Sequence, residues 1–304
     1  MRAGLKIFVT LLFILLAILP ARAQETYPSL WQSGDWVLQR GLEDLLSQLG
    51  FQRAVEEKSL SVALVDITDH ASPRLASVNG NEMMYAASLP KIAILLGVFD
   101  RIDHGNLELS TEITDKLRLM IRNSSNKAAT EMLNEVGKPH LAKLLQSPQY
   151  QLYDLAQNGG LWVGKDYGKA PAWKRDPLHN ISHGATALQT ARFYYLLETG
   201  RLVSPEASKT MKKILGKPAI HHKFVKGLEK ARPGSVIYRK SGTWHQYHSD
   251  SAIVERDGRR YIAVGLSKSR RGGEWLDRLI VALDDLIFLS RKQPIQLSRL
   301  DDKN

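Results

Sequence analysis

The sequence predicts an α+β fold in which one antiparallel sheet, flanked by N- and C-terminal helices, carries an inserted all-helical lobe. Strand-like patterns fall into two distant groups, within 61–78 and 236–267, and mostly helical patterns fill the chain between them. Further helical segments stand outside both groups, at 34–49 and 275–289. Two strand groups so far apart most economically pair in one sheet, which makes the intervening block a second lobe.

The opening elements have clear local signals. Ser33 can cap the helix over 34–49 through its hydroxyl. Five residues would form the apolar side of this helix, namely Trp36, Leu38, Leu42, Leu45 and Leu46. Strands are expected at 61–67 and 74–78, joined by a turn near 70–72.

The helical lobe is expected over about residues 88–232. Helical patterns recur along it, at 89–102, 110–146, 185–198 and from Ser204 onward. Pro90 fits the first turn of the first helix, because the amide that proline lacks would be unpaired there. Residues 148–184 are rich in Gly, Pro, Tyr and Trp and predict a long structured loop, a type of segment that is often functional.

The chain returns to strands after Pro233-Gly234. Three strands are expected, at 236–239, 251–256 and 260–267. Asp257-Gly258 between the last two is a strong hairpin signal. Together with the first strands and the closing helix, these segments predict a sheet lobe made of about residues 33–80 and 234–292.

The amino terminus has the pattern of a secretory signal. A basic start, an apolar run over 7–19 and the Ala21-x-Ala23 pattern predict cleavage after Ala23. An uncleaved membrane anchor is the alternative, but the run is short for a bilayer of ~30 Å. Cleavage of residues 1–23 would leave 24–304 as one catalytic domain, periplasmic or secreted and not stably inserted in a membrane.

Composition excludes several classes of function. The formal net charge of +11 falls by three, to +8, once residues 1–23 are removed, and the basic residues are scattered, which argues against nucleic acid as a partner. The chain has no cysteine, which excludes thiol catalysis and thiolate metal sites. Its paired histidines lack the His-Glu-x-x-His pattern of zinc enzymes. No metal or other cofactor is therefore expected.

A candidate nucleophile stands at the start of a helix. In Ser88-Leu89-Pro90-Lys91 the serine hydroxyl lies near the positive end of the helix dipole, and the lysine lies one turn later on the same face. Burial lowers a lysine pKa, so that the neutral amine can accept the serine proton. Taken alone, the pattern also fits a capping serine followed by a surface lysine.

Two further motifs follow in the chain. Ser124-Ser125-Asn126 stands at a break between two predicted helices, where a capping cluster is the alternative interpretation. Lys240-Ser241-Gly242-Thr243 stands at the end of a predicted strand, and its glycine would let another backbone or a ligand approach closely. An ordinary strand end with a turn is the alternative for this motif.

In this order and setting, the three motifs resemble those of the penicillin-recognising serine hydrolases: class A β-lactamases and the related penicillin-binding DD-peptidases. That family carries Ser-x-x-Lys, Ser-Asp-Asn and Lys-Thr-Gly. The helix after the second motif and the segment Leu196–Ser204 also resemble the family. The resemblance spans roughly Ser33 to Leu289 and implies the β-lactamase/transpeptidase-like form of the predicted fold.

The resemblance implies a catalytic role for five residues. Ser88 would attack a carbonyl and become acylated, and Lys91 would accept its proton. Ser124 would pass a proton to the leaving nitrogen. Asn126 would hold Lys91 and the substrate amide, while Lys240 would supply positive charge near Ser124.

The resemblance also implies the substrate-binding residues Ser241, Gly242 and Thr243. The hydroxyls of Ser241 and Thr243 would contact a substrate carboxylate. The backbone amides of Ser88 and Thr243 would form the oxyanion hole.

The sequence departs from the family pattern in the second and third motifs and in the long loop. Ser125 and Ser241 replace the usual aspartate and threonine, and the spacing from Lys91 to Ser124 is shorter than in typical class A β-lactamases. Those enzymes use a loop glutamate for deacylation, followed by proline. Here Asp176 precedes a proline and is one methylene shorter. It is expected either to act as the deacylating base or to pair structurally with Arg175 or another arginine.

Three functions are compatible with these observations. The first is an exported, β-lactamase-like serine hydrolase that forms an acyl-enzyme at Ser88 with β-lactams or D-alanyl peptides. The second is a peptidoglycan DD-carboxypeptidase or endopeptidase with slow β-lactam turnover. The third is a catalytically quiet wall-binding protein, which the joint presence of Ser88, Lys91, Ser124 and Lys240 argues against.

Overall fold

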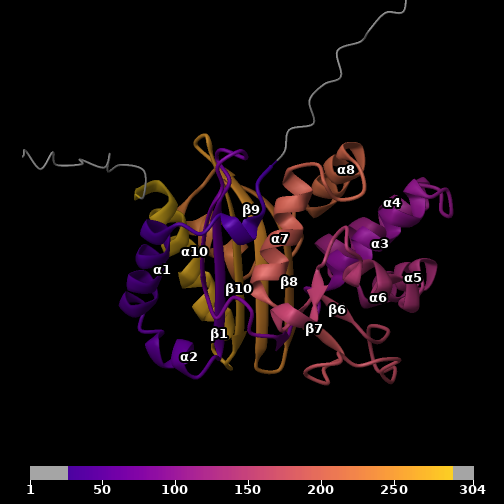
Figure 1. Cartoon of the computed structure of the whole chain (residues 1–304), viewed down its shortest axis with the longest axis horizontal. Helices are drawn as coiled ribbons and strands as arrows, with labels where there is room; N and C mark the ends of the chain where they lie inside the picture. Colours follow the sequence, from indigo (N-terminus) through magenta and orange to yellow (C-terminus); the bar gives the residue numbers. More distant parts are fainter. Residues whose placement is uncertain (1–26, 290–304) are drawn as a thin grey trace, which may run out of the picture.

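A computed structural model describes residues 27–289 and places a five-stranded antiparallel sheet beside a helical lobe (Figure 1). The strand order in the sheet is β2 (Arg74–Val78), β1 (Leu60–Asp66), β10 (Arg259–Lys268), β9 (Tyr247–Arg256) and β8 (Val236–Trp244). The first and last strand groups of the sequence therefore pair directly, through β1 and β10. This confirms the predicted α+β fold.

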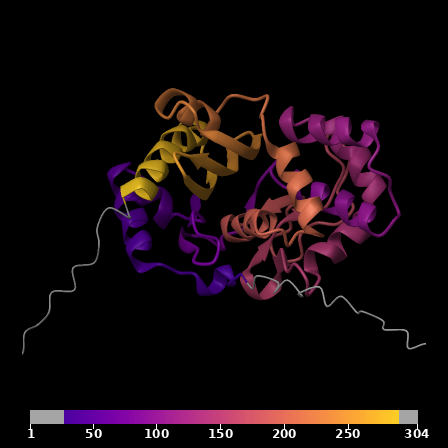
Figure 2. The same ribbon diagram turned by 90° about the horizontal axis from the view of Figure 1, so that it is seen from above.

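Helices cover both faces of this sheet (Figures 1 and 2). One face carries α1 (Trp36–Gln48), α9 (Phe224–Ala231) and α10 (Gly272–Leu289), and the other carries α7 (Ala187–Glu198). Alternate residues of β1 pack on opposite faces of the sheet. Val62 and Leu64 pack with α1 and α10, whereas Ala63 and Val65 pack with α7 and the helical lobe. A slip of one residue would invert both sets, so burial on both faces fixes the register.

The helical lobe is built from α3 (Lys91–Asp103), α4 (Thr111–Arg122), α5 (Asn126–Val136), α6 (Lys138–Gln146) and α8 (Pro205–Leu215). The helix α3 lies at its centre, and its residues from Lys91 to Asp100 are all buried. Ser110 and Ser204 cap α4 and α8 through their hydroxyls, as the sequence predicts. This lobe faces the sheet along its edge strand β8.

The long loop between α6 and α7 contains short structure of its own. It includes η2 (Leu155–Gln157), the strand pair β4 (Tyr153–Asp154) and β5 (Gly159–Gly160), and the strands β6 (Trp162–Val163) and β7 (His183–Ala185). The strand β3 (Met84–Tyr85), just before the nucleophile motif, pairs with β7. The loop is thereby fastened beside Ser88.

The N-terminal segment differs from expectation. Ser33 follows η1 (Leu30–Gln32) and donates to the carbonyl of Ser29, while Asp35 caps α1 by accepting from the amide of Leu38 at 2.8 Å. Trp36 is 74% exposed, so its assignment to the apolar side was wrong. It lies two residues, or about 200° of helical turn, before the buried Leu38.

Three other boundaries also differ. The helix expected from Leu89 begins at Lys91, and β8 continues through the third motif to Trp244. The helix α9 (Phe224–Ala231) was not predicted; it lies within the range expected for the helical lobe but packs against α10 on the sheet. The short helix α2 (Gln52–Glu56) was likewise not predicted. The predicted signal segment, 1–23, lies outside the described residues.

Within residues 27–289, no helix is both long enough and apolar enough to cross a bilayer.

The C-terminal helix is fixed to the sheet by a buried carboxylate. Asp284 accepts hydrogen bonds from Arg256, Arg232 and the hydroxyl of Tyr261, and its side chain is fully buried. Its neighbour Asp285 pairs with Arg232 but is half exposed. The two positions therefore compare a buried with an exposed ion pair on one helix.

We expect Asp284→Ala to lower the free energy of unfolding by about 1–3 kcal/mol, because it leaves the buried Tyr261 hydroxyl and two partly exposed arginines without their acceptor. The matched change Asp285→Ala should cost less than about 1 kcal/mol. Chemical denaturation of both variants measures the difference. Equal losses of unfolding free energy in the two variants would show that burial does not increase the contribution of Asp284.

Candidate active site

Ser88 lies in a tight turn between β3 and α3. Its predecessor Ala87 has a left-handed backbone, with φ of 51°, and the amide of Lys91 donates to the Ser88 carbonyl at 3.3 Å. The side chain of Ser88 is half buried and lines a cleft of about 580 Å³. The serine thus stands at the entrance to a buried helix, open to a ligand.

The third motif approaches this turn so closely that only glycine fits. A Cβ atom at Gly242 would lie 2.7 Å from the amide nitrogen of Ser88 and would collide with the carbonyl oxygen of Ala86. The neighbouring Thr243 also lines the cleft. The backbones that carry the amides of Ser88 and Thr243 are therefore held side by side, as an oxyanion hole requires.

Lys91 is fully buried at the start of α3. Its Nζ donates to the Ser124 carbonyl at 2.6 Å and to Oδ1 of Asn126 at 2.8 Å, and it lies 4.5 Å from the centre of the Tyr167 ring. None of these partners carries a negative charge. Burial therefore lowers the pKa of the Lys91 amine to about 7, so that a large fraction is neutral at physiological pH.

Ser124 lies between two lysines. It occupies the break between α4 and α5 in a left-handed conformation, with φ of 56°. Its Oγ accepts from Lys240 Nζ at 2.9 Å and from Lys91 Nζ at 3.5 Å. Ser125 caps α5 instead of entering the cleft. In the second motif, Ser124 contacts both lysines, Ser125 caps α5 and Asn126 accepts a hydrogen bond from Lys91.

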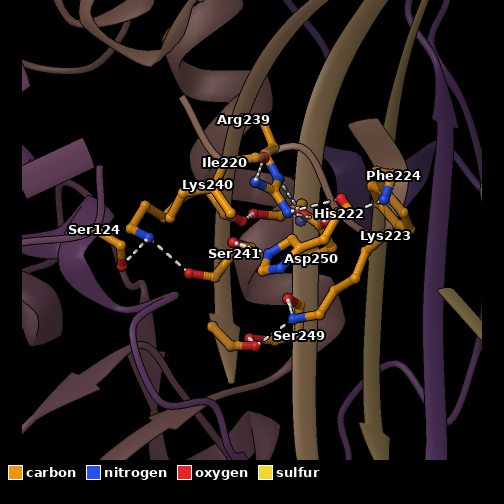
Figure 3. A network of polar contacts seen from close by, with 12 residues as sticks. Ser124, Ile220, His222, Lys223, Phe224, Arg239, Lys240, Ser241, Ser249 and Asp250 are labelled. Atoms are coloured by element: carbon orange, nitrogen blue, oxygen red, sulfur yellow. Dashed lines mark hydrogen bonds and ion pairs between the residues drawn. The ribbon is translucent and has the colours of Figure 1, made fainter. Parts of the chain in front are cut away.

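Lys240 projects from β8 toward Ser124, as Figure 3 shows. It is 1% exposed and also donates to the carbonyl of Ser241 at 2.6 Å. Burial, together with the positive charges of Lys91 and Arg239, holds the pKa of Lys240 well below its usual value. The first and third motifs are therefore joined through one serine hydroxyl.

A second buried network supports β8 from behind (Figure 3). Asp250 on β9 accepts two bonds of 2.7 Å from Arg239 and one from the amide of Phe224. Lys223 donates to the carbonyl of Gly242 at 2.6 Å and to Oγ1 of Thr243 at 2.8 Å. Lys223, Arg239 and Asp250 were not predicted as site residues, because none of them belongs to the three motifs.

The proposed substrate-binding residues lie together at the end of β8. Ser241 is buried, and its hydroxyl lies 3.2 Å from Nε2 of His222. Burial and the neighbouring Lys223 lower the pKa of His222 to about 4, so its ring is neutral. Gly242 lies against the nucleophile turn, and Thr243 lines the cleft while its hydroxyl accepts from Lys223.

Asp176 does not enter the cleft. Its carboxylate is buried and accepts hydrogen bonds from the Tyr153 hydroxyl and the His179 amide. Arg175 donates to the Asn180 carbonyl instead of pairing with Asp176. Asp176 therefore holds the loop through Tyr153 and His179. The expected structural pair with Arg175 is not formed.

The histidines divide among separate surroundings. His179 bonds to Asn158, whereas His183 is buried in the wall of the cleft. Within residues 27–289, no three His, Asp or Glu side chains gather closely enough to hold a metal ion.

Comparison with known proteins places this geometry in a family. A family model described as "Beta-lactamase enzyme family" matches residues 42–116 and 111–287, and the chain belongs to that family. No curated protein sequence matches the chain.

Solved structures share the fold at low sequence identity. The chain is 18% identical to PBP-A, with a TM-score of 0.62, over 86% of this chain and 98% of that one. A β-lactamase from Sphaerobacter thermophilus is also 18% identical, with a TM-score of 0.62, over 82% and 96%. A PBP-A variant solved as an acyl-enzyme complex with penicillin-G is 19% identical, with a TM-score of 0.59, over 80% and 96%.

The lowered pKa of Lys91 predicts how acylation of Ser88 depends on pH. Because only the neutral amine can accept a proton, the acylation rate should rise about tenfold per pH unit below about 7 and level off above it. Stopped-flow acylation over roughly pH 5 to pH 9 measures this profile. A rate that is flat across the range, or still rising at its upper end, would exclude Lys91 as a base with this pKa.

Proposed function

We propose that the protein is an exported serine acyl-transfer enzyme whose Ser88 is acylated by β-lactams and by D-alanyl peptides of the cell wall. The observation that carries the proposal is the set of hydrogen bonds that joins Lys91, Ser124 and Lys240, beside a cleft lined by Ser88 and by Asn126, a partner of Lys91. Membership of the Beta-lactamase enzyme family supports it. The acyl-enzyme complex of the PBP-A variant with penicillin-G gives a precedent for the chemistry in a protein of this fold.

In the proposed acylation step, neutral Lys91 takes the proton from Ser88 Oγ as that oxygen attacks the substrate carbonyl. The amides of Ser88 and Thr243 stabilise the oxyanion. The carbonyl–nitrogen bond then breaks, and the leaving nitrogen receives a proton through Ser124. The contacts of Ser124 with both lysines support this relay.

Release of the acyl group is proposed to be slow. No carboxylate lines the cleft among residues 27–289, and the best sequence candidate, Asp176, is occupied elsewhere. Rapid hydrolysis needs a base that activates water beside the ester. This observation favours a peptidoglycan DD-carboxypeptidase or endopeptidase with slow β-lactam turnover over an efficient β-lactamase.

We expect benzylpenicillin to leave one acyl adduct on the protein and none on Ser88→Ala. Intact-mass spectrometry of protein recovered from cells measures the adduct, and the same spectrum shows whether residues 1–23 have been removed, as export through a signal predicts. An undiminished adduct on Ser88→Ala would remove the nucleophile assignment. Absence of any adduct on the wild type would instead favour the catalytically quiet wall-binding protein.

A pair of substitutions at Asp176 tests the slow release. Asp176→Ala should lower the free energy of unfolding by about 2–4 kcal/mol, because the Tyr153 hydroxyl and the His179 amide lose their acceptor. The near-isosteric Asp176→Asn should keep the lifetime of the acyl-enzyme within about threefold of wild type, since the side chain does not face the ester. Fast wild-type deacylation that Asp176→Asn abolishes would show that Asp176 is the base after all.

A further inference from the structure

The charged side chains that line the cleft are all cationic. Lys165, Lys169 and Arg175 come from the long loop, and no Asp or Glu of the described chain lines the same space. Lys165 donates to the carbonyl of Gly168 at 2.9 Å and Arg175 to that of Asn180 at 3.1 Å, so both are held by backbone instead of by acids.

The acids nearest to them in the loop have other partners. Asp166 forms a 2.7 Å ion pair with Lys138 of α6, and Asp176 is bonded to Tyr153 and His179. The loop-side wall of the cleft therefore carries positive charge that the loop's own carboxylates do not offset. Such a wall attracts an anionic group.

A buried polar pair in the same wall points to a ligand as well. His183 is 2% exposed and stacks on Tyr167, with ring centroids 4.2 Å apart and planes 6° apart. Neither ring nitrogen of His183, nor the buried hydroxyl of Tyr167, has a hydrogen-bond partner within the described chain. Buried polar atoms in native proteins nearly always have partners, so this pair has unused capacity to bind a polar group.

Charge on His183 does not supply that capacity. Burial, with the positive charges of Lys165 and Lys91, lowers the pKa of His183 to about 3, so its ring is neutral and offers one donor and one acceptor. Positive charge in this wall comes from the lysines and the arginine.

The wall adjoins the nucleophile. The amide of Ala86 donates to the carbonyl of His183 at 3.0 Å, which ties β7 to the residues just before Ser88. Thr243 and Trp244 of β8 line the same cleft. An acyl group attached to Ser88 in this cleft therefore has residues of the long loop and of β8 as neighbours.

We propose that the loop-side wall is a subsite for a carboxylate on the acyl part of the substrate. Lys165, Lys169 and Arg175 supply the charge, and His183 and Tyr167 supply uncharged hydrogen bonds in the same wall. The inference rests on the proposed function and names its substrate class: acyl donors that carry an acidic group on the acyl side of the reacting carbonyl.

Two penicillins test the subsite, because benzylpenicillin and α-carboxybenzylpenicillin differ by one carboxylate on the acyl side chain. We expect the carboxylated compound to acylate Ser88 about tenfold faster at low ionic strength, and the ratio to shrink in high salt. Lys165→Gln and Arg175→Gln should each lower this ratio severalfold, and the triple variant that adds Lys169→Gln should bring it close to one. Lys174→Gln removes the same charge from the same loop outside the cleft and should keep the wild-type ratio.

Each other outcome decides against one of the two proposals. Equal wild-type rates, or a preference that survives the triple variant, would overturn the subsite. A fall of both rates in parallel would do so too, since it would place the cations' effect on the nucleophile and not on the acyl group. Absence of an adduct from both penicillins would overturn the proposed function instead.

Discussion

Four buried basic side chains surround the edge strand β8 and the nucleophile, and one buried carboxylate offsets them. Lys91, Lys223, Arg239 and Lys240 are each less than 5% exposed, and Asp250 pairs directly with Arg239. Burying an uncompensated charge is costly, so the lysines respond by lowering their proton affinity. The pKa values of Lys91 and Lys223 fall to about 7, and that of Lys240 falls well below its usual value.

The proposed chemistry depends on this constraint. An ordinary lysine is protonated at neutral pH and cannot accept the proton of a serine. Lys91 can do so because its partners, two backbone carbonyls and the Asn126 amide, are all neutral. A carboxylate beside it would restore the charge. No Asp or Glu of residues 27–289 lines the cleft, which favours a neutral Lys91 and hence the proposed acylation. For the same reason the cleft offers no carboxylate base for fast release of the acyl group.

Much of the fold and of the nucleophile machinery could be predicted from the sequence. Short strand-like runs located β1, β2 and β10, of which β1 and β10 are largely buried, and Asp257-Gly258 has positive φ at both residues, as a two-residue hairpin turn requires. The three motifs could be recognised because each combines particular residue types with a predicted local structure: a helix start, a helix break or a strand. A local pattern was sufficient for prediction where the expected backbone structure and the residue types indicated the same feature.

The rest depended on tertiary contacts that a local pattern does not contain. Spacing suggested Asp176 as a base, but spacing does not say which way a side chain points, and its carboxylate turns to Tyr153. His183 was expected only as one of several histidines that line the cleft or lie on the surface, and its place in the wall follows from the pairing of β7 with β3. Lys223 gave no signal, because its three acceptors lie on strands that follow it in the chain.

The most direct test of the account is the ionisation of Lys91 itself. Heteronuclear NMR of lysine side chains labelled at Nζ and Cε, with Lys91→Arg and Lys223→Arg to assign the signals, follows each amine through its titration. The account predicts that the Lys91 signal titrates near pH 7, about three pH units below an ordinary lysine. A Lys91 signal that remains protonated until about pH 10 would contradict the central claim, because no neutral amine would then be present to activate Ser88.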